Sequence, residues 1–274
     1  MLDRSSRARA AAVALVVGIA VGATTSARAQ AQPGDTQFRA TIYGWFPGLS
    51  GTTEFPSGAG GPSIDVDAAD LISGLKMTFM GNFEAQFGKW GAMVDWIYTD
   101  IGSDKSGSRD FVIHGQTLPI GLTANLSLDV KTNILTLAGT YSFIEKPNYT
   151  TGLVFGARML DMDQTLVWSL NGTGPLNVAR SGVAEVSATN WDAIIGVRGR
   201  ARFGDDLRWF VPYYADIGGG DSKLTWQVIV GAGYSFSWGD VLVAWRYLDY
   251  EFDSGQPVQS LTFNGVAAGV SFRF

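Results

Sequence analysis

The sequence predicts an all-β protein, a closed antiparallel up-and-down transmembrane β-barrel of about ten strands. Apolar residues recur at every second position over several stretches, which is typical of strands with one apolar face. Aromatic residues begin and end the clearest of these stripes, as they do where barrel strands pass the two edges of a bilayer. After residue 29 no apolar run is long enough for a membrane helix. A soluble all-β sandwich is the alternative, and it would turn its apolar faces inward.

The first 29 residues have the pattern of a secretory signal peptide. Arg4, Arg7 and Arg9 precede an apolar run over residues 10–21, and residues 27–29 offer a small-x-small cleavage site. A single membrane anchor is the alternative, but the run is shorter than the roughly 20 residues that span a bilayer. We therefore expect removal of residues 1–29, with residues 30–274 forming one barrel domain of an exported protein.

Charge and composition exclude several kinds of partner and of chemistry. Residues 1–29 hold four of the 20 basic and one of the 25 acidic residues, so residues 30–274 carry a net charge of −8. A nucleic-acid partner is not expected for a chain with this charge. The absence of cysteine from the sequence removes disulfides and thiolate chemistry. No cofactor is predicted.

In the N-terminal half, the pattern predicts a strand over residues 36–46 and a clear hairpin over residues 77–99. The faces of the first strand are poorly resolved, whereas a turn at residues 88–91 separates the two arms of the hairpin. Residues 56–75 are rich in Gly, Pro and Asp and are predicted to form a loop. We interpret its acids, Asp65, Asp67 and Asp70, as solvated, because the spacing lacks the Gly and distal Glu of a calcium loop. Residues 102–125 are predicted to be the longest loop, in which alternating residues extend the flanking strands.

In the C-terminal half, strands are predicted over residues 135–143, 153–168, 191–203 and 209–217, with three more between residues 224 and 274. Residues 171–188 are predicted to form a loop. Pro212 removes a donor from a strand ladder, so we expect a local bulge there. The total is about ten strands, with eight or twelve as alternatives, and an even number places both ends of the barrel on one side of the membrane.

The final strand ends the chain on an aromatic residue. Its outward positions are predicted to be Val266, Ala268, Val270, Phe272 and Phe274. This strand resembles the C-terminal signal that the bacterial outer-membrane assembly machinery reads. The resemblance implies that the partners are this machinery, outer-membrane lipid and lipopolysaccharide.

Three further segments, residues 190–200, 216–226 and 245–250, resemble an uncharacterised family of proteobacterial outer-membrane β-barrel proteins. The resemblance implies a porin-like barrel in the outer membrane of a Gram-negative cell. It carries over no catalytic residues.

Charged residues with inward parity are predicted to line the lumen. Arg198, Arg200 and Arg202 lie on one face of their strand, opposite Trp191 and Ile195, and each would cost about 2–4 kcal/mol if it faced lipid at mid-depth. Because buried charges persist when they are paired and hydrogen-bonded, we expect arginine–carboxylate bridges across a narrow interior. The predicted network comprises Glu84, Asp95, Arg158, Asp192, Arg198, Arg200, Arg202, Asp216, Arg246 and Arg273.

Three functions are open from the sequence. A closed lumen predicts a non-enzymatic barrel that is structural or presents its loops at the surface. Solvated arginines near one mouth would instead form a narrow passive channel for small solutes or apolar molecules. A hydrolase at the rim needs a nucleophile and a positioned base; His114 has Asp104 and Asp110 nearby, but no serine at a spacing that suggests a dyad. We favour the closed barrel and expect neither catalysis nor a metal site at His114.

Overall fold

Ten antiparallel strands form a closed ring. The computed structural model describes residues 36–53, 63–66, 75–106, 112–113, 116–117, 122–172, 179–253 and 258–274. In sequence the ring strands are β1 (Thr36–Thr53), β3 (Leu75–Phe87), β4 (Trp90–Ser106), β7 (Leu122–Lys146), β8 (Tyr149–Gly172), β9 (Ala179–Phe203), β10 (Trp209–Gly220), β11 (Leu224–Ser235), β12 (Gly239–Glu251) and β13 (Val258–Arg273). The predicted closed ten-strand barrel is confirmed, while the predicted signal peptide lies outside the described residues.

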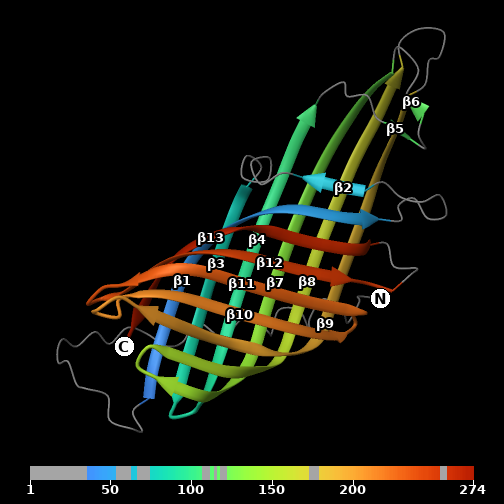
Figure 1. Cartoon of the computed structure of the whole chain (residues 1–274). Helices are drawn as coiled ribbons and strands as arrows, with labels where there is room; N and C mark the ends of the chain where they lie inside the picture. Colours follow the sequence, from blue (N-terminus) through green and yellow to red (C-terminus); the bar gives the residue numbers. More distant parts are fainter. Residues whose placement is uncertain are drawn as a thin grey trace, which may run out of the picture. The chain divides into compact units, whose positions relative to one another are not determined.

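Pairing between the first and last strands closes the ring. β1 pairs with β13 from Arg39 opposite Arg273 to Thr53 opposite Val258. The Phe38 amide donates to the Phe274 carbonyl oxygen (2.9 Å), and the Phe274 amide donates to the Phe38 carbonyl oxygen (3.1 Å). Figure 1 shows the two walls of the barrel, with β10–β13 in orange and red crossing over β4, β7 and β8 in green and yellow. Closure leaves no edge strand in the ring, as a wall surrounded by lipid requires.

The connections differ between the two ends of the barrel. At one end, which we call the short-turn end, two residues join β3 to β4 and two join β7 to β8, while the β9–β10 and β11–β12 connections are also short. Gly88 opens the β3–β4 turn with a φ of +58°, a backbone conformation that favours glycine. Thr36 lies opposite Phe87 at this end, and Phe274 pairs with Phe38. The first strand of the ring therefore begins here and the last strand ends here. At the opposite end, which we call the long-strand end, β10 and β11 are joined by a short turn, but 21 residues lie between β1 and β3 and 15 lie between β4 and β7.

Several strands extend farther toward the long-strand end than the sequence predicts. β7, β8 and β9 have 25, 24 and 25 residues, whereas β10 and β11 have 12 each. The predicted loop at residues 171–188 is wrong for residues 171–172, which belong to β8, and for residues 179–188, which belong to β9. The predicted loop at residues 102–125 contains strand at both its ends, as the expected strand extension anticipated. The strand predicted over residues 36–46 continues to Thr53.

Within the described ranges, three short strands lie outside the ten-strand ring. β2 (Ser63–Val66), within the predicted loop at residues 56–75, pairs with Leu49–Thr52 of β1. β5 (Val112–Ile113) and β6 (Gln116–Thr117) form a separate two-stranded sheet.

The prediction of a bulge at Pro212 is wrong, because the β9–β10 pairing passes through Pro212 opposite Arg200 without a register shift. Among the described residues no helix is long and apolar enough to cross a membrane.

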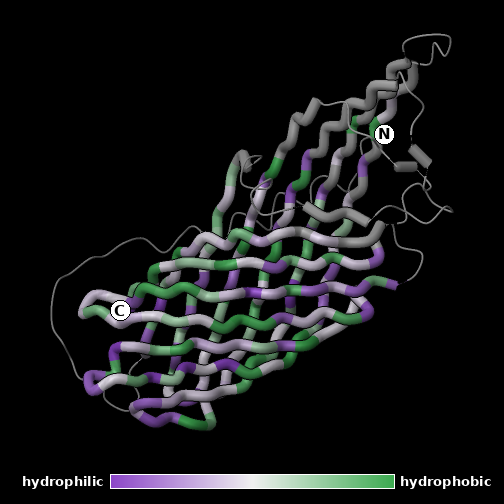
Figure 2. Tube along the Cα trace, turned by 45° about the horizontal axis from the view of Figure 1, so that its top comes forward, coloured by the Kyte–Doolittle hydropathy of each residue, from purple (hydrophilic) through white to green (hydrophobic). Residues whose placement is uncertain are grey.

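The outer face of the barrel is apolar. Hydrophobic and hydrophilic residues alternate along the strands (Figure 2), and the outward set includes Ile195, which is 60% exposed, and Val266, which is 52% exposed. The outward positions predicted for β13 include the exposed Phe272 and Phe274. So many exposed large apolar side chains are rare on a soluble monomer and typical of a lipid-facing wall.

The outward face becomes polar toward the long-strand end. Met159 shares its face of β8 with Asp161 and Asp163, which come two and four residues later toward that end. On β9, Glu185 is exposed on the outward face, six residues before Trp191 toward the long-strand end. Since charged side chains avoid the hydrocarbon layer, this change in polarity indicates that β8 and β9 extend beyond the lipid-facing band.

Candidate functional site

The inward charged residues form two layers in the lumen. One layer lies at the short-turn end, and we call it the mouth layer; its members are Arg39, Glu84, Arg198, Arg200, Arg202, Asp240 and Arg273. The other lies farther along the strands, and we call it the middle layer; its charged members are Asp95, Arg158, Asp192, Asp216 and Arg246. All ten residues of the predicted network therefore lie in these layers, together with Arg39 and Asp240.

Arg246 on β12 is bound to Asp95 on β4 across the lumen. Its Nη2 donates to Asp95 Oδ2 (2.9 Å), and its Nε donates to Gln227 Oε1 (2.9 Å). The Tyr43 hydroxyl accepts from Arg246 Nη1 (2.9 Å) and donates to Asp95 Oδ1 (2.7 Å). Arg246 and Asp95 are 3% and 7% exposed. Several charge-assisted hydrogen bonds thus offset the cost of removing this ion pair from water.

A second buried pair joins β8 to β10. Arg158 Nη2 donates to Asp216 Oδ2, and both side chains are fully buried. The hydroxyls of Thr136 and Thr225 lie 3.4 Å from Arg158 Nε and Nη1. Asp192 faces Arg158 in the β8–β9 register, but its Oδ1 accepts from the Ser222 amide (2.8 Å). The Asp192 carboxylate therefore binds the turn between β10 and β11.

In the mouth layer, two carboxylates are each shared by two arginines. Glu84 Oε1 accepts from Arg198 Nη2 (2.7 Å), and Glu84 Oε2 lies 3.6 Å from Arg39 Nη1. Asp240 Oδ2 accepts from Arg200 Nη1 (2.7 Å), and Asp240 Oδ1 lies 3.2 Å from Arg273 Nη2.

The fifth mouth-layer arginine is Arg202. Its Nη1 lies 3.5 Å from the Leu207 carbonyl oxygen, which is a long contact for a hydrogen bond. Among the described residues no carboxylate lies within ion-pair distance of Arg202.

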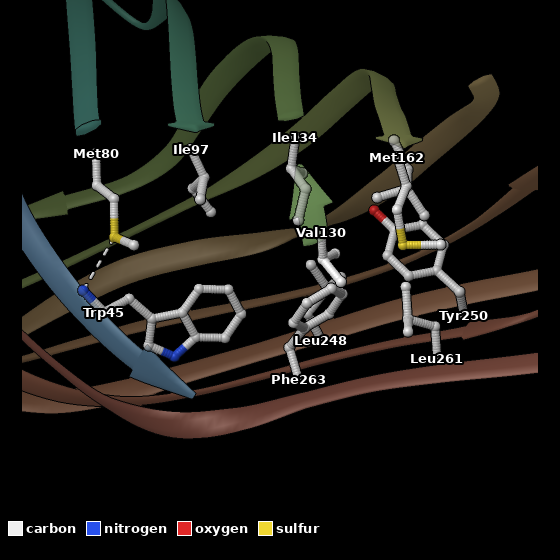
Figure 3. Packing of buried hydrophobic residues seen from close by; sticks show 11 residues of the cluster. Trp45, Met80, Ile97, Val130, Ile134, Met162, Leu248, Tyr250, Leu261 and Phe263 are labelled. Atoms are coloured by element: carbon white, nitrogen blue, oxygen red, sulfur yellow. Dashed lines mark hydrogen bonds between the residues drawn. The ribbon is translucent and has the colours of Figure 1, made fainter. Parts of the chain in front are cut away.

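Apolar side chains fill the lumen beyond the middle layer. Ile97 follows Asp95 and Leu248 follows Arg246 by two residues toward the long-strand end, and Trp45 follows Tyr43, which binds both of these charged groups. The three apolar side chains therefore form the next inward level. They belong to a buried cluster, which we call the apolar plug: Trp45, Met80, Ile97, Val130, Ile134, Leu160, Met162, Leu248, Tyr250, Leu261 and Phe263. Figure 3 shows side chains from opposite walls meeting in this cluster. The Arg246 guanidinium lies over the Trp45 ring, 4.8 Å from its centroid, which links the plug to the middle layer.

A smaller apolar cluster separates the two charged layers. Met93 precedes Asp95 by one inward position on β4, and it packs with Ala138, Val154 and Tyr214. From the short-turn end, the lumen therefore contains a charged mouth layer, a small apolar level, the charged middle layer and the apolar plug.

Some lumen residues were not predicted from the sequence. Arg39 and Tyr43 share the inward face of β1 with the buried Trp45, but both faces of this strand carry aromatic residues. Asp240 is the second residue of β12 and is fully buried. An inward parity count from Arg246 back to Asp240 would have placed Asp240 in the lumen.

Most of the other candidate site residues fall outside the part of the chain that the structure describes. His114 and Asp110 are outside the described residues, as are Asp67 and Asp70. Asp104 lies in β4 opposite Ser127 of β7. Among the described residues no group of three His, Cys, Asp or Glu side chains is arranged to hold a metal ion.

No family model matches the chain, and no curated protein matches it. Solved structures similar to it include the outer-membrane protease OmpT of Escherichia coli, with 12% identity, a TM-score of 0.45 and coverage of 90% of this chain and 99% of that one. They also include the attachment invasion locus protein Ail of Yersinia pestis, with 9% identity, a TM-score of 0.35 and coverage of 89% and 100%. The toluene transporter TodX of Pseudomonas putida has 9% identity, a TM-score of 0.32 and coverage of 89% and 90%.

The class of protein follows from the chain's own geometry. The closed antiparallel ring, the apolar outer face and the charged interior together define an outer-membrane β-barrel fold.

Proposed function

We propose that this protein is a non-enzymatic outer-membrane barrel with a closed lumen, which presents its long strands and loops at the cell surface. The observation that carries the proposal is the buried bridge between Arg246 and Asp95. In the ring order, β12 and β4 are separated by β13, β1 and β3 on the shorter side. The bridge therefore crosses the lumen and does not merely run along its wall.

The remaining layers support closure. Arg198 and Glu84 also lie on strands separated by three others, β8, β7 and β4. The apolar plug adds large side chains such as Trp45 and Phe263, whose ring centroids are 5.9 Å apart. A barrel of about ten strands has an interior that its own side chains nearly fill, so these layers leave little room for a solute.

The connections at the two ends of the barrel support one orientation of the protein in the membrane. Short turns face the periplasm in bacterial barrels and long connections face outward, so we place the short-turn end in the periplasm. The β8 and β9 extension, with Asp161, Asp163 and Glu185 on its outer face, then stands above the lipid in the lipopolysaccharide zone. The proposed partners are outer-membrane lipid, lipopolysaccharide and the assembly machinery that receives the Phe274-ended strand.

A liposome-swelling assay tests closure. Residues 30–274 are refolded into liposomes loaded with an impermeant polymer, and the liposomes are diluted into iso-osmotic arabinose or glycine. We expect the swelling rate of empty liposomes, while an open porin in parallel liposomes swells quickly. Swelling in proportion to the amount of folded protein would contradict the proposal.

The second candidate function is a narrow channel for small anions. The mouth layer favours it, because the Arg273 side chain is 40% exposed and Arg39 and Arg198 are about one-quarter exposed. Solvated arginines at a constriction select anions. In that case the swelling assay would show uptake of small anionic solutes ahead of neutral ones.

A further inference from the structure

The mouth layer carries an excess of positive charge. It contains five arginines and only two carboxylates, Glu84 and Asp240. Each carboxylate binds two of the arginines within ion-pair distance, and the fifth, Arg202, lies beyond ion-pair distance of both. The middle layer has no such excess, since Asp95 and Asp216 each bind one arginine.

The positive groups are also held close together by the backbone. Arg39 and Arg273 are direct partners in the β1–β13 register, and like charges directly opposite each other destabilise a sheet. Arg202 follows Arg200 on the inward face of β9, where the Asp240 carboxylate attracts it and Arg273 and Arg39 repel it. Closing the barrel therefore brings Arg39, Arg202 and Arg273 toward one another at the mouth.

Two of these guanidinium groups have unused donors. Arg39 Nε is buried and has no hydrogen-bond partner among the described residues. Arg202 has the single long contact to the Leu207 carbonyl oxygen. Arg200 is fixed against the Phe210 ring, with its Cζ 3.9 Å from the ring centroid, while it binds Asp240. The site thus combines positioned charge with guanidinium donors that lack a protein acceptor, of which those of Arg202 are the more accessible because Arg39 Nε is enclosed by protein.

We propose that the mouth layer binds a phosphate group, with Arg39, Arg202 and Arg273 donating to its oxygens. A guanidinium presents a planar fork of donors that matches two phosphate oxygens. A net charge of +3 at the mouth layer suits a dianion better than the single charge of a carboxylate. The phosphate belongs either to a soluble periplasmic molecule or to the headgroup of an inner-leaflet lipid. This inference goes beyond the proposed function: the source of the phosphate rests on the proposed orientation of the barrel, but the site itself does not depend on whether the lumen conducts.

The test compares Arg202→Gln with Arg208→Gln. Arg202 has no carboxylate partner among the described residues, so its removal leaves no buried acid unpaired. Arg208, the matched control, lies in the adjacent turn in an exposed pair with Asp206 (3.3 Å). The refolded proteins are titrated in zwitterionic detergent with inorganic phosphate or with chloride at equal ionic strength, and the thermal unfolding midpoint is recorded. Heat-modifiable migration on a gel shows that each variant has folded.

We expect phosphate to raise the unfolding midpoint of the wild type and of Arg208→Gln beyond the effect of chloride. In Arg202→Gln the phosphate concentration needed for the same shift should rise about tenfold, because one charge-assisted interaction is lost. A lipid arm repeats the comparison in phosphatidylcholine bilayers with and without phosphatidylglycerol. A shift caused only by phosphatidylglycerol and weakened by Arg202→Gln assigns the phosphate to lipid. No specific shift with either probe, or the same shift in all three proteins, would overturn the proposal.

Discussion

At the residue scale, the Asp95–Arg246 pair shows how the lumen tolerates charge. Either charge is tolerated in the lumen only while the other is present, because a buried charge without a partner loses its hydration and gains nothing in return. Tyr43 and Gln227 satisfy the remaining donor and acceptor positions. The stability of the pair is therefore a property of the set of contacts.

We predict that Asp95→Leu and Arg246→Met each lower the free energy of unfolding by about 3 kcal/mol, because each leaves one buried charge unpaired. The double variant should recover more than half of that loss, since two apolar side chains of similar size remove the uncompensated charge. Urea unfolding of the refolded proteins in detergent, followed by tryptophan fluorescence, measures the cycle. Additive losses in the double variant would show that the two side chains do not interact.

The inward parity of single strands was enough to place Asp95, Arg158 and Arg246 in the lumen. It was not enough to assign partners, because cross-lumen neighbours depend on the stagger and radius of the closed ring. The pairing of Arg158 with Asp216 on β10 and the use of Asp192 by a turn amide follow from that three-dimensional arrangement. Arg39 was missed because aromatic residues on both faces of β1 hide its alternation.

At the element scale, the strand ends were the least predictable feature. Alternation is a strong signal only where one face meets lipid and the other meets the lumen. Beyond Met159 on β8 the outward face carries Asp161 and Asp163, so the contrast between the faces fades although the ladder continues. The sequence of residues 179–188 was therefore interpreted as a loop, whereas the hydrogen-bonded register of β9 with β8 runs through it.

Close packing of an aromatic side chain over a glycine ties β8, β9 and β10 together near the short-turn end. The Tyr213 hydroxyl donates to the Tyr149 hydroxyl (2.9 Å) from a ring that lies against Gly199 on the strand between them. A Cβ atom on Gly199 would lie 2.2 Å from the Tyr213 hydroxyl oxygen and 2.2 Å from the Thr150 carbonyl oxygen. Such distances leave no room for any side chain.

We predict that Gly199→Ala destabilises the barrel by about 2 kcal/mol through this overlap. Gly219→Ala is the matched control, because its Cβ would have no neighbour closer than 3.4 Å, and it should change stability by less than about 0.5 kcal/mol. The same urea unfolding assay compares the two variants. Equal stability of the two would show that β9 and Tyr213 move apart at little cost.

At the scale of the whole barrel, the interior is stratified along its axis. The mouth layer is charged and partly solvated, the middle layer is charged and buried, and the plug is apolar. This order places the apolar plug on the long-strand side of both charged layers. If several layers close the lumen, as we propose, the loss of one bridge would not by itself open it.

Single-channel recording in a planar bilayer tests closure most directly. The refolded wild type, shown to be folded by its heat-modifiable migration, should give no conductance steps in concentrated potassium chloride. A variant with glycine at Trp45, Asp95, Arg246 and Phe263 should conduct, because it removes the bridge and part of the plug while serving as a control for insertion. Steady conductance steps from the folded wild type would contradict the closed lumen and establish the channel function in its place.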